Sequence, residues 1–296
     1  MSTSGVRRAR PLLGTLVEVS AWGDGPVCRG AVEGAFRAVA RVQELMSVHD
    51  QDSELSRVNR EALDRPVKVH PWTAAVLRFA LRLHRESEGA FDCGVGSRLE
   101  SAGFLPAGSA RSKCDSAPAS SGNVTIDAAN RVRFKRPVCL DLGGIAKGYA
   151  VDRAVAALRH TDVEGGVINA GGDLRAFGVG AMPIAVRDPY SPGRCAQVLR
   201  LGVGAVATSA GYHAGARVRG RVVMPVYDPL RQRFLGRDLS VTVVAGDCMT
   251  ADALTKVAAI LGARAAPVLR HHGASALWWR RGQAQPKWEE PCAAAA

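Results

Sequence analysis

The segment Asp141–Asp152 holds residue types suited to binding a phosphate group. It joins a predicted strand to a predicted helix. Gly143 and Gly144 let a ligand approach the backbone closely, and the start of a helix attracts negative charge. Lys147 adds a cation, and Asp141 adds a hydrogen-bond acceptor. A glycine turn that carries an exposed lysine explains the segment equally well, because neither GxxxxGK[ST] nor GxGxxG is present.

A second chemical segment, Gly246–Lys256, follows a predicted strand and starts a helix. Thr250 is the predicted N-cap of that helix, which puts Asp252 in its first turn. A carboxylate there can simply stabilise the helix dipole. It can also be a magnesium ligand, because Mg²⁺ prefers one or two carboxylates together with ligand phosphates and water.

Two further small-residue segments are predicted as turns. Asn169–Asp173 is a tight turn in which Asp173 either bonds the local backbone or belongs to a site. Ala207–Tyr212 presents the hydroxyls of Thr208 and Ser209. The motif GxSxG is absent and no Ser–His–Asp order is identifiable, so a hydrolase triad is not expected.

The elements that position these residues can be predicted from hydrophobic periodicity. Helices are expected over 28–46, 71–88, 146–159 and 250–261, with a polar interruption at 47–59 and a surface loop at 106–123. Strands are expected over 12–20, 124–126, 132–140, 166–169, 184–187, 197–203, 217–223 and 240–245. No regular βαβ order appears, which favours an α+β fold with mixed or antiparallel sheets packed with helices. The prediction is one domain over residues 1–296, with a flexible tail at about 284–296.

Composition narrows the classes of protein. The chain has 296 residues, of which 47% are hydrophobic, and this fraction is typical of a globular protein. Its net charge of +12 suggests an anionic partner. No nucleic-acid-reading motif and no transmembrane run is present, so neither nucleic acid nor membrane insertion is expected. The seven cysteines have no CxxC spacing, and no signal peptide is recognisable, so a cytoplasmic location is predicted.

Taken together, the motifs resemble those of the FAD:protein FMN transferases, the ApbE family, from Leu13 to Gly262. Each motif is weak alone, but their order along the chain matches the family. In chain order they are 46–59 (MSVHDQDSELSRVN), 89–92 (GAFD), 141–152, 169–173, 208–209 (TS), 227–229 (YDP) and 251–254 (ADAL).

The resemblance implies a single T-fold-like domain and a reaction. Family members bind FAD and transfer its FMN half to a threonine or serine of a target flavoprotein, releasing AMP, with Mg²⁺ holding the phosphates. By position, the implied FAD-binding residues are Leu13, His49, Ala90, Phe91, Asp92, Asp141, Lys147 and Tyr227. Leu13 replaces the usual methionine, and His49 the usual tyrosine. The implied metal ligands are the Gly144 carbonyl and Asp252, and the implied catalytic residues are Asp252 and Lys256.

Two positions depart from the family pattern. Lys256 stands where the family has a metal-ligating threonine or serine, and an ammonium group cannot ligate Mg²⁺, although it can neutralise a pyrophosphate. Thr255, one residue earlier, points in a different direction on a helix. Pro225 stands where the family has a histidine, for which His213 could compensate. An active transferase and a divergent flavin-binding protein with weak or no transfer activity therefore both remain open.

Overall fold

A computed structural model describes residues 5–108, 120–178, 180–191, 193–211, 215–218, 220–280 and 287–289. The chain divides into two compact units. Unit 1 contains residues 1–43, 147–210 and 239–296, and unit 2 contains residues 44–146 and 211–238. The expectation that the whole chain is a single domain stays a prediction. The predicted tail at 284–296 and His213 lie outside the described residues, apart from a short strand at 287–289.

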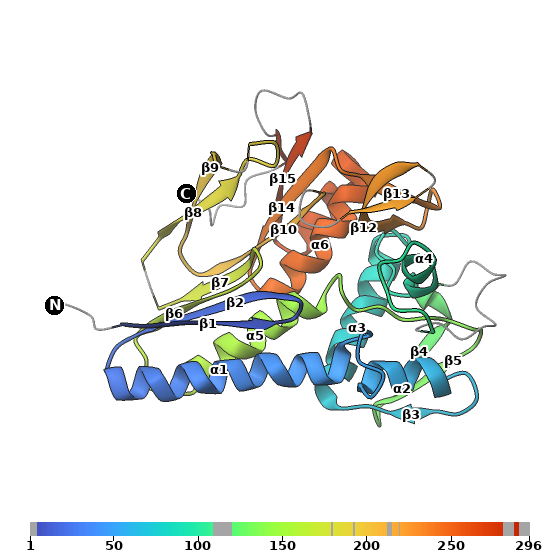
Figure 1. Ribbon diagram of the computed structural model, residues 1–296, viewed down its shortest axis with the longest axis horizontal. Coiled ribbons are helices and arrows are strands. Elements are labelled where there is room, and N and C mark those ends of the chain that lie inside the picture. The colour runs from blue at the N-terminus through green and yellow to red at the C-terminus, as the bar shows by residue number, and fades with distance from the viewer. Residues whose placement is uncertain are drawn as a thin grey trace. The chain divides into compact units, whose positions relative to one another are not determined.

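Unit 1 is built on one eight-stranded sheet (Figure 1). Every neighbouring pair in this sheet is antiparallel. In spatial order its strands are β1 (Gly5–Leu12), β2 (Thr15–Trp22), β6 (Gly165–Ala170), β7 (Asp173–Phe177), β10 (Gly204–Ala210), β14 (Leu239–Ala245), β15 (Ser275–Arg280) and β16 (Lys287–Glu289).

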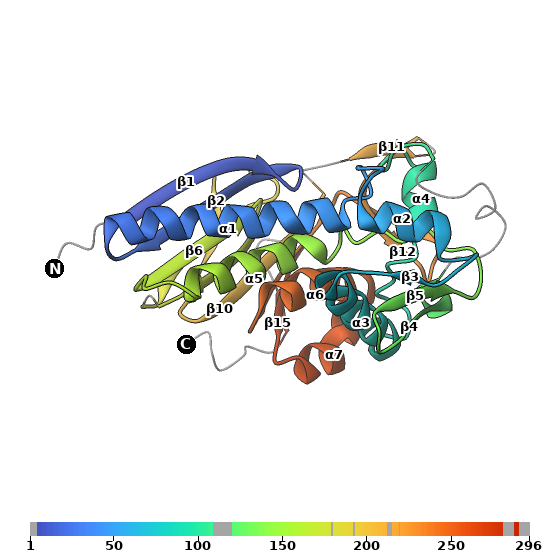
Figure 2. The same ribbon diagram turned by 90° about the horizontal axis from the view of Figure 1, so that it is seen from below.

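Helices cover one face of this sheet. Figure 2 shows α1 (Gly25–Met46) and α5 (Ala146–Arg159) running side by side along it. The helix α6 (Cys248–Leu261) packs on β10 and β14, and it is followed by a 3₁₀ turn (Gly262–Ala265) and α7 (Ala266–His271). The β-hairpin formed by β8 (Met182–Arg187) and β9 (Cys195–Leu201) packs its apolar residues against Ala176, Val206 and Leu277 of the sheet. In the central strands, the side chains on both faces of the sheet are therefore buried.

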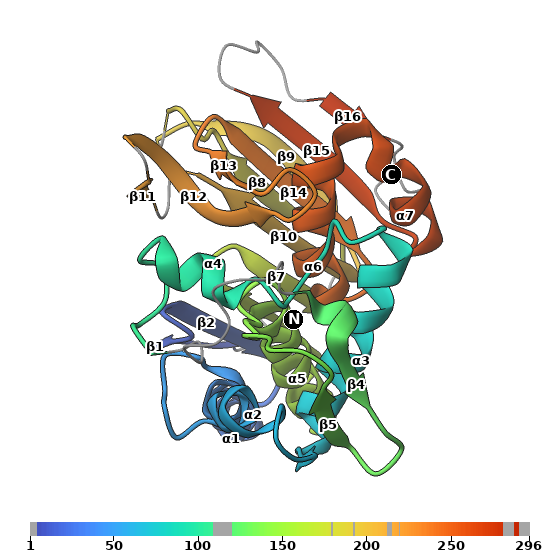
Figure 3. The ribbon, with the colours of Figure 1, turned by 90° about the vertical axis from the view of Figure 1, so that its right-hand side faces the viewer.

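Unit 2 is smaller and mixes short helices with two three-stranded antiparallel sheets. One sheet has the order β3 (Val67–Lys68), β5 (Arg131–Phe134) and β4 (Val124–Ile126), and Figure 3 shows α3 (Pro71–Glu86) beside it. The other has the order β11 (Ala216–Val218), β12 (Arg221–Asp228) and β13 (Arg233–Gly236). The remaining elements are α2 (Glu54–Glu61), α4 (Gly96–Ser101) and a 3₁₀ turn (Ser121–Asn123).

The predicted fold class, α+β with antiparallel sheets packed with helices, is confirmed. The helix predicted over 146–159 begins and ends as expected. Several local predictions are wrong, among them the strand predicted over 132–140, which ends at Phe134. Thr208 and Ser209 lie in the central strand β10, not in a turn. The polar segment 47–59 contains the start of α2, whose N-cap Ser53 accepts a hydrogen bond from the Ser56 amide. Among the described residues of 217–223, Arg217 and Val218 belong to β11 and residues 221–223 to β12, so the segment is not one strand.

The N-cap of α6 is also different from the prediction. Asp247 caps this helix, because its carboxylate accepts hydrogen bonds from both the amide and the hydroxyl of Thr250. Asp252 is therefore the fifth residue of α6 and lies beyond the first turn. Its carboxylate does not stabilise the start of its own helix, and one of its partners, the Gly148 amide, lies in α5.

Candidate functional site

The N-termini of α5 and α6 in unit 1 cap each other. The carboxylate of Asp252, on α6, accepts a hydrogen bond of 3.1 Å from the Gly148 amide in the first turn of α5. In return, the carboxylate of Asp152, on α5, accepts bonds of 2.9 and 2.8 Å from the Cys248 and Met249 amides that begin α6. Amides at a helix start have no partner within the helix, and the helix dipole favours an anion beside them. Each aspartate therefore stabilises the other helix.

This arrangement requires glycine at position 148. A Cβ atom added there would lie 2.2 Å from the Cys248 carbonyl oxygen, 2.6 Å from the Cys248 carbonyl carbon and 2.8 Å from the Cβ of Asp252. Real Cβ atoms essentially never come that close to such neighbours. The absence of a side chain at Gly148 is what allows the two helix starts to touch.

Two lysine–aspartate pairs lie beside these helix starts. The ammonium of Lys147, on α5, is paired with Asp173 at the start of β7. The ammonium of Lys256 is paired with Asp252 one turn earlier on α6. Both carboxylates are almost completely buried, whereas the Lys147 and Lys256 side chains are 33% and 16% exposed. The cluster is therefore balanced in charge, and the lysine side chains are its more exposed members.

The two buried carboxylates differ in acidity. Burial raises the pKa of Asp252, but Lys256 and then Lys147 outweigh burial and bring that pKa below its ordinary value. Burial and the neighbouring Asp252 carboxylate raise the pKa of Asp173, against the opposing effects of Lys147 and Lys256. The Cys248 thiol beside them has a raised pKa because of burial and then Asp173, so it is not a thiolate nucleophile. Asp252 is the carboxylate of the pair that holds its negative charge more firmly.

The hydroxyls near the cluster are engaged inside the protein. Thr255 donates a hydrogen bond of 2.7 Å to the Asp252 backbone carbonyl, and it shares a bond of 2.7 Å with Ser209 on β10. Its side chain is fully buried. Thr208 bonds Thr242 across the strands at 2.9 Å. Thr255 therefore links α6 to the sheet and does not replace a hydroxyl ligand at position 256.

Leu13 is the remaining predicted site residue of unit 1. It has a φ of 55° and forms, with Gly14 (φ 68°), the two-residue turn between β1 and β2. A left-handed leucine is uncommon and indicates a position that its surroundings hold in place. Its amide donates to Gln43 Oε1 at 2.6 Å, which ties the turn to α1.

The predicted site residues of unit 2 include a group around Asp92. Ala90 and Phe91 are buried, and the Phe91 carbonyl contacts His84 Nδ1 at 2.9 Å. The Asp92 carboxylate accepts bonds from the Gly94 and Ser121 amides at 2.7 and 2.8 Å. Asp92 therefore also holds its own loop together, which the sequence did not indicate.

The other predicted residues of unit 2 lie on separate segments. His49 is exposed in the turn before α2. Asp141 receives a hydrogen bond from the Gly143 amide at 3.2 Å, in the turn that also contains Gly144. Tyr227, on β12, packs edge to face on Phe234 with ring centroids 5.1 Å apart, and burial raises the pKa of its hydroxyl. Their roles in FAD or metal binding stay predictions.

Sequence reasoning missed several partners in unit 1. Arg175, on β7, pairs with Asp152 at 2.6 Å and so supports the cap of α6. Asp173 was predicted only as a turn residue or a site residue, and it proves to be the partner of Lys147. The available signal for Asp173 as a site residue was its place directly after the small residues Ala170, Gly171 and Gly172.

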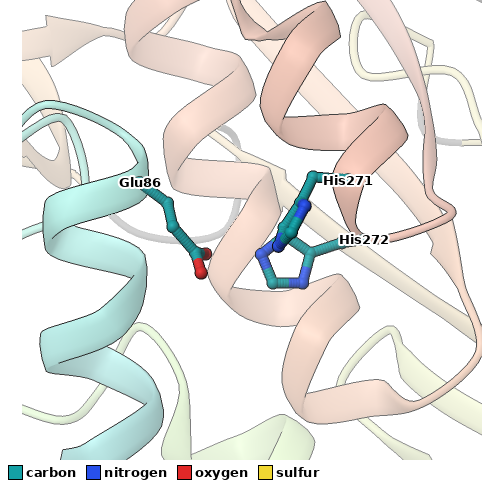
Figure 4. A group of neighbouring side chains, drawn as sticks. All are labelled: Glu86, His271 and His272. Carbon is teal, nitrogen blue, oxygen red and sulfur yellow. The ribbon is translucent and has the colours of Figure 1, made fainter.

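Two other features of unit 1 contain no predicted site residue. His271 and His272 end α7 and pack edge to face, with ring centroids 5.1 Å apart (Figure 4). Figure 4 also labels Glu86, which ends α3 in unit 2. A hollow of about 460 Å³ lies over β1, β2 and β6, and its lining includes Arg7 and Trp22.

The fold and the charged cluster define an α+β protein with one lysine at the start of α5 and a second lysine farther along α6. The chain matches the model of the ApbE family over residues 13–278, and it belongs to that family. It is 31% identical to a Vibrio cholerae FAD:protein FMN transferase over 243 residues, which are 76% of this chain and 72% of the relative. A Haemophilus influenzae FAD:protein FMN transferase is 29% identical over 75% of this chain and 69% of the relative.

A solved structure agrees with these sequence relatives. The crystal structure of the ApbE protein from Thermotoga maritima matches with a TM-score of 0.85 and 29% identity, and the match covers 97% of both chains. Within the part of the chain that the structure describes, no helix is both long and apolar enough to cross a membrane.

Proposed function

We propose that this chain is a flavin transferase that moves FMN from FAD to a threonine or serine hydroxyl of a target flavoprotein and releases AMP. Membership of the ApbE family and the FAD:protein FMN transferases among its relatives support the proposal. The observation that carries it is the cluster at the starts of α5 and α6. There, Lys147 and Lys256 present positive charge of the kind that a pyrophosphate needs.

The reaction needs charge neutralisation more than covalent chemistry. The acceptor hydroxyl oxygen forms a bond to the FMN-side phosphorus, and the bond from that phosphorus to the bridging oxygen breaks. AMP leaves with the bridging oxygen and its electron pair, and the hydroxyl proton is released. Negative charge develops on the phosphate oxygens, and fixed cations stabilise it. Lys147 and Lys256 are the candidate groups for this role, and Asp252 positions Lys256.

The site residues predicted from the resemblance remain part of the proposal. Leu13, His49, Ala90, Phe91, Asp92, Asp141 and Tyr227 would contact the flavin or adenine parts of FAD. For Leu13, the support is its left-handed backbone conformation, because strained residues cluster at ligand-binding sites. For Tyr227, the support is its aromatic ring, which is held in place by Phe234 and is of a kind that packs on other rings. A protein acceptor follows from the same function.

Magnesium is the part of the predicted function that the side chains of unit 1 fit poorly. Asp252 was predicted as a ligand together with the Gly144 carbonyl. One oxygen of Asp252 is paired with the Lys256 ammonium, and the other accepts the Gly148 amide. Mg²⁺ demands oxygen ligands in near-octahedral geometry, and an ammonium group on the same carboxylate repels it. The steps above therefore use no metal ion.

A second candidate function is flavin binding without efficient transfer. Pro225 supports it, because this position on β12 has no side chain that can accept the hydroxyl proton. The two candidates differ in one experiment. The purified protein is incubated with FAD and with flavoprotein domains that carry an accessible threonine, and intact-mass spectrometry then looks for an added FMN. A covalent FMN adduct supports transfer. FAD binding with no adduct on any acceptor contradicts transfer and leaves flavin binding.

A further inference from the structure

The Asp252 carboxylate is fully engaged by groups of its own unit. Lys256 lies one helical turn after it, and its ammonium contacts both Oδ1 of Asp252 and, at 3.1 Å, the backbone carbonyl of the same residue. The Gly148 amide occupies Oδ2 at 3.1 Å. With 1% of its side chain exposed, Asp252 has no open face toward solvent. A divalent ion could reach this carboxylate only after the Lys256 ammonium had moved away.

The charges around Asp252 also disfavour an added divalent cation. Lys147 and Lys256 both interact electrostatically with Asp252, and Asp173 is already matched by Lys147. Two ammonium groups therefore neutralise two carboxylates in a mostly buried place. A further dication would meet both ammonium groups without a spare anion among the described residues of this cluster.

The lysines keep donors for a ligand. An ammonium group has three N–H donors. Among the described residues, Lys256 directs two of its donors at Asp252, and Lys147 directs one at Asp173. Their remaining donors can bond phosphate oxygens, and both side chains are partly exposed. The pair of lysines can therefore donate hydrogen bonds to the oxygens of a pyrophosphate.

We propose that the Lys256 ammonium takes the place of a divalent cation on Asp252, so that this chain binds the pyrophosphate of FAD without magnesium. This inference rests on the proposed function and deepens it. Lysine supplies one positive charge at a fixed point, and the helix holds it there through the four-residue spacing from Asp252 to Lys256. No change in metal occupancy is needed before FAD binds.

The wild-type protein provides the first test. FAD is titrated into metal-free protein in the presence of EDTA and, separately, of millimolar magnesium chloride, and flavin fluorescence reports binding. The expected dissociation constants differ by less than about threefold. A titration of the protein with manganese chloride alone, followed by electron paramagnetic resonance, should show no site of micromolar affinity. FAD binding that requires magnesium, or a tight manganese site that Asp252→Asn removes, overturns the inference.

A pair of variants provides the second test. Lys256→Thr removes the ammonium and frees Oδ1 of Asp252, so FAD affinity in EDTA should fall by about tenfold or more, and magnesium should recover much of it. Lys68→Thr is the control, because it removes the same side chain at an exposed position of β3 in unit 2. It should behave as wild type. Lys256→Thr with unchanged affinity in EDTA overturns the inference.

The outcomes separate this inference from the proposed function. If FAD binds only with magnesium, the inference that Lys256 takes the place of the metal ion is wrong, and flavin binding stands. If FAD binds under neither condition, the proposed function fails and the inference fails with it. Circular dichroism checks that Lys256→Thr is folded, and the wild-type titrations decide the question if it is not.

Discussion

Replacement of Gly148 by alanine should destabilise the protein, although alanine is the better helix former. Gly148 is the third residue of α5. Helix propensity alone predicts a gain of up to about 1 kcal/mol from Gly→Ala. The structure predicts the opposite sign, because the new methyl group would lie 2.2 Å from the Cys248 carbonyl oxygen. The nearest neighbours, the carbonyl oxygen and carbon of Cys248, are backbone atoms, so no side-chain rotation can relieve that contact.

The magnitude follows from the two ways in which the contact can be relieved. Overpacking of a close-packed interior costs about 1–3 kcal/mol. If the helix starts separate instead, Asp252 loses the Gly148 amide, and Asp152 loses the Cys248 and Met249 amides. Each lost helix cap costs about 0.5–2 kcal/mol. After a gain in propensity of about 1 kcal/mol is subtracted, the middle of either range gives an expected net loss of about 1–1.5 kcal/mol in the free energy of unfolding.

Gly30→Ala is the matched control for this prediction. Gly30 lies within α1 of the same unit, and a Cβ added there would have nothing within 4 Å. It should gain about 0.5–1 kcal/mol. Urea or guanidinium unfolding followed by circular dichroism measures both variants, with an unchanged slope showing that stability alone has changed. If Gly148→Ala is as stable as wild type, or shares the gain of Gly30→Ala, the close approach of α5 and α6 is wrong.

Two further predictions concern single side chains. Burial raises the pKa of Asp252, but Lys256 and Lys147 outweigh it and leave the folded-state pKa below 3.8, so its contribution to stability is complete above pH 3.8 and is lost as pH falls through the folded value. The unfolding midpoints of wild type and Asp252→Asn should therefore differ near neutral pH and converge as the pH falls through the lowered folded-state pKa of Asp252, and a constant difference would contradict the pairing with lysine. Among the described cysteines, Cys195 is exposed and the other four are buried, so brief alkylation of the native protein followed by peptide mass spectrometry should modify Cys195 first. Faster modification of Cys248 would show that its surroundings are open.

Elements with strong local signals could be predicted from the sequence. The helix at 146–159 and the strand at 124–126 have the expected bounds, because periodicity and flanking turn residues define them. The strand β10 was missed because Thr208 and Ser209 look like turn residues. Its strand character comes from pairing with β7 on one side and β14 on the other, and such tertiary context overrides local propensity.

The candidate site was only partly predictable for a similar reason. Lys147, Asp252 and Lys256 were identified, and the structure brings them together in unit 1. The partners were not, because the Gly148–Asp252 bond and the Asp152–Cys248 bond join residues about one hundred positions apart. Local sequence made Thr250 look like the cap of α6, whereas Asp247 caps it and Asp152 reinforces it from another helix.

The reciprocal caps change what a phosphate at this site would bind. The sequence suggested that the start of a helix beside Lys147 attracts phosphate through its free amides. In the structure, the Gly148 amide already bonds Asp252, and the first four amides of α6 are bonded to Asp152 and Asp247. Aspartate carboxylates, and for Ala251 the Asp247 backbone carbonyl, therefore already occupy these helix amides. The attraction for a pyrophosphate must then come from ammonium groups that have unused N–H donors. For this reason, the presence of Lys256 in place of the family's hydroxyl residue matters most for pyrophosphate binding by this chain.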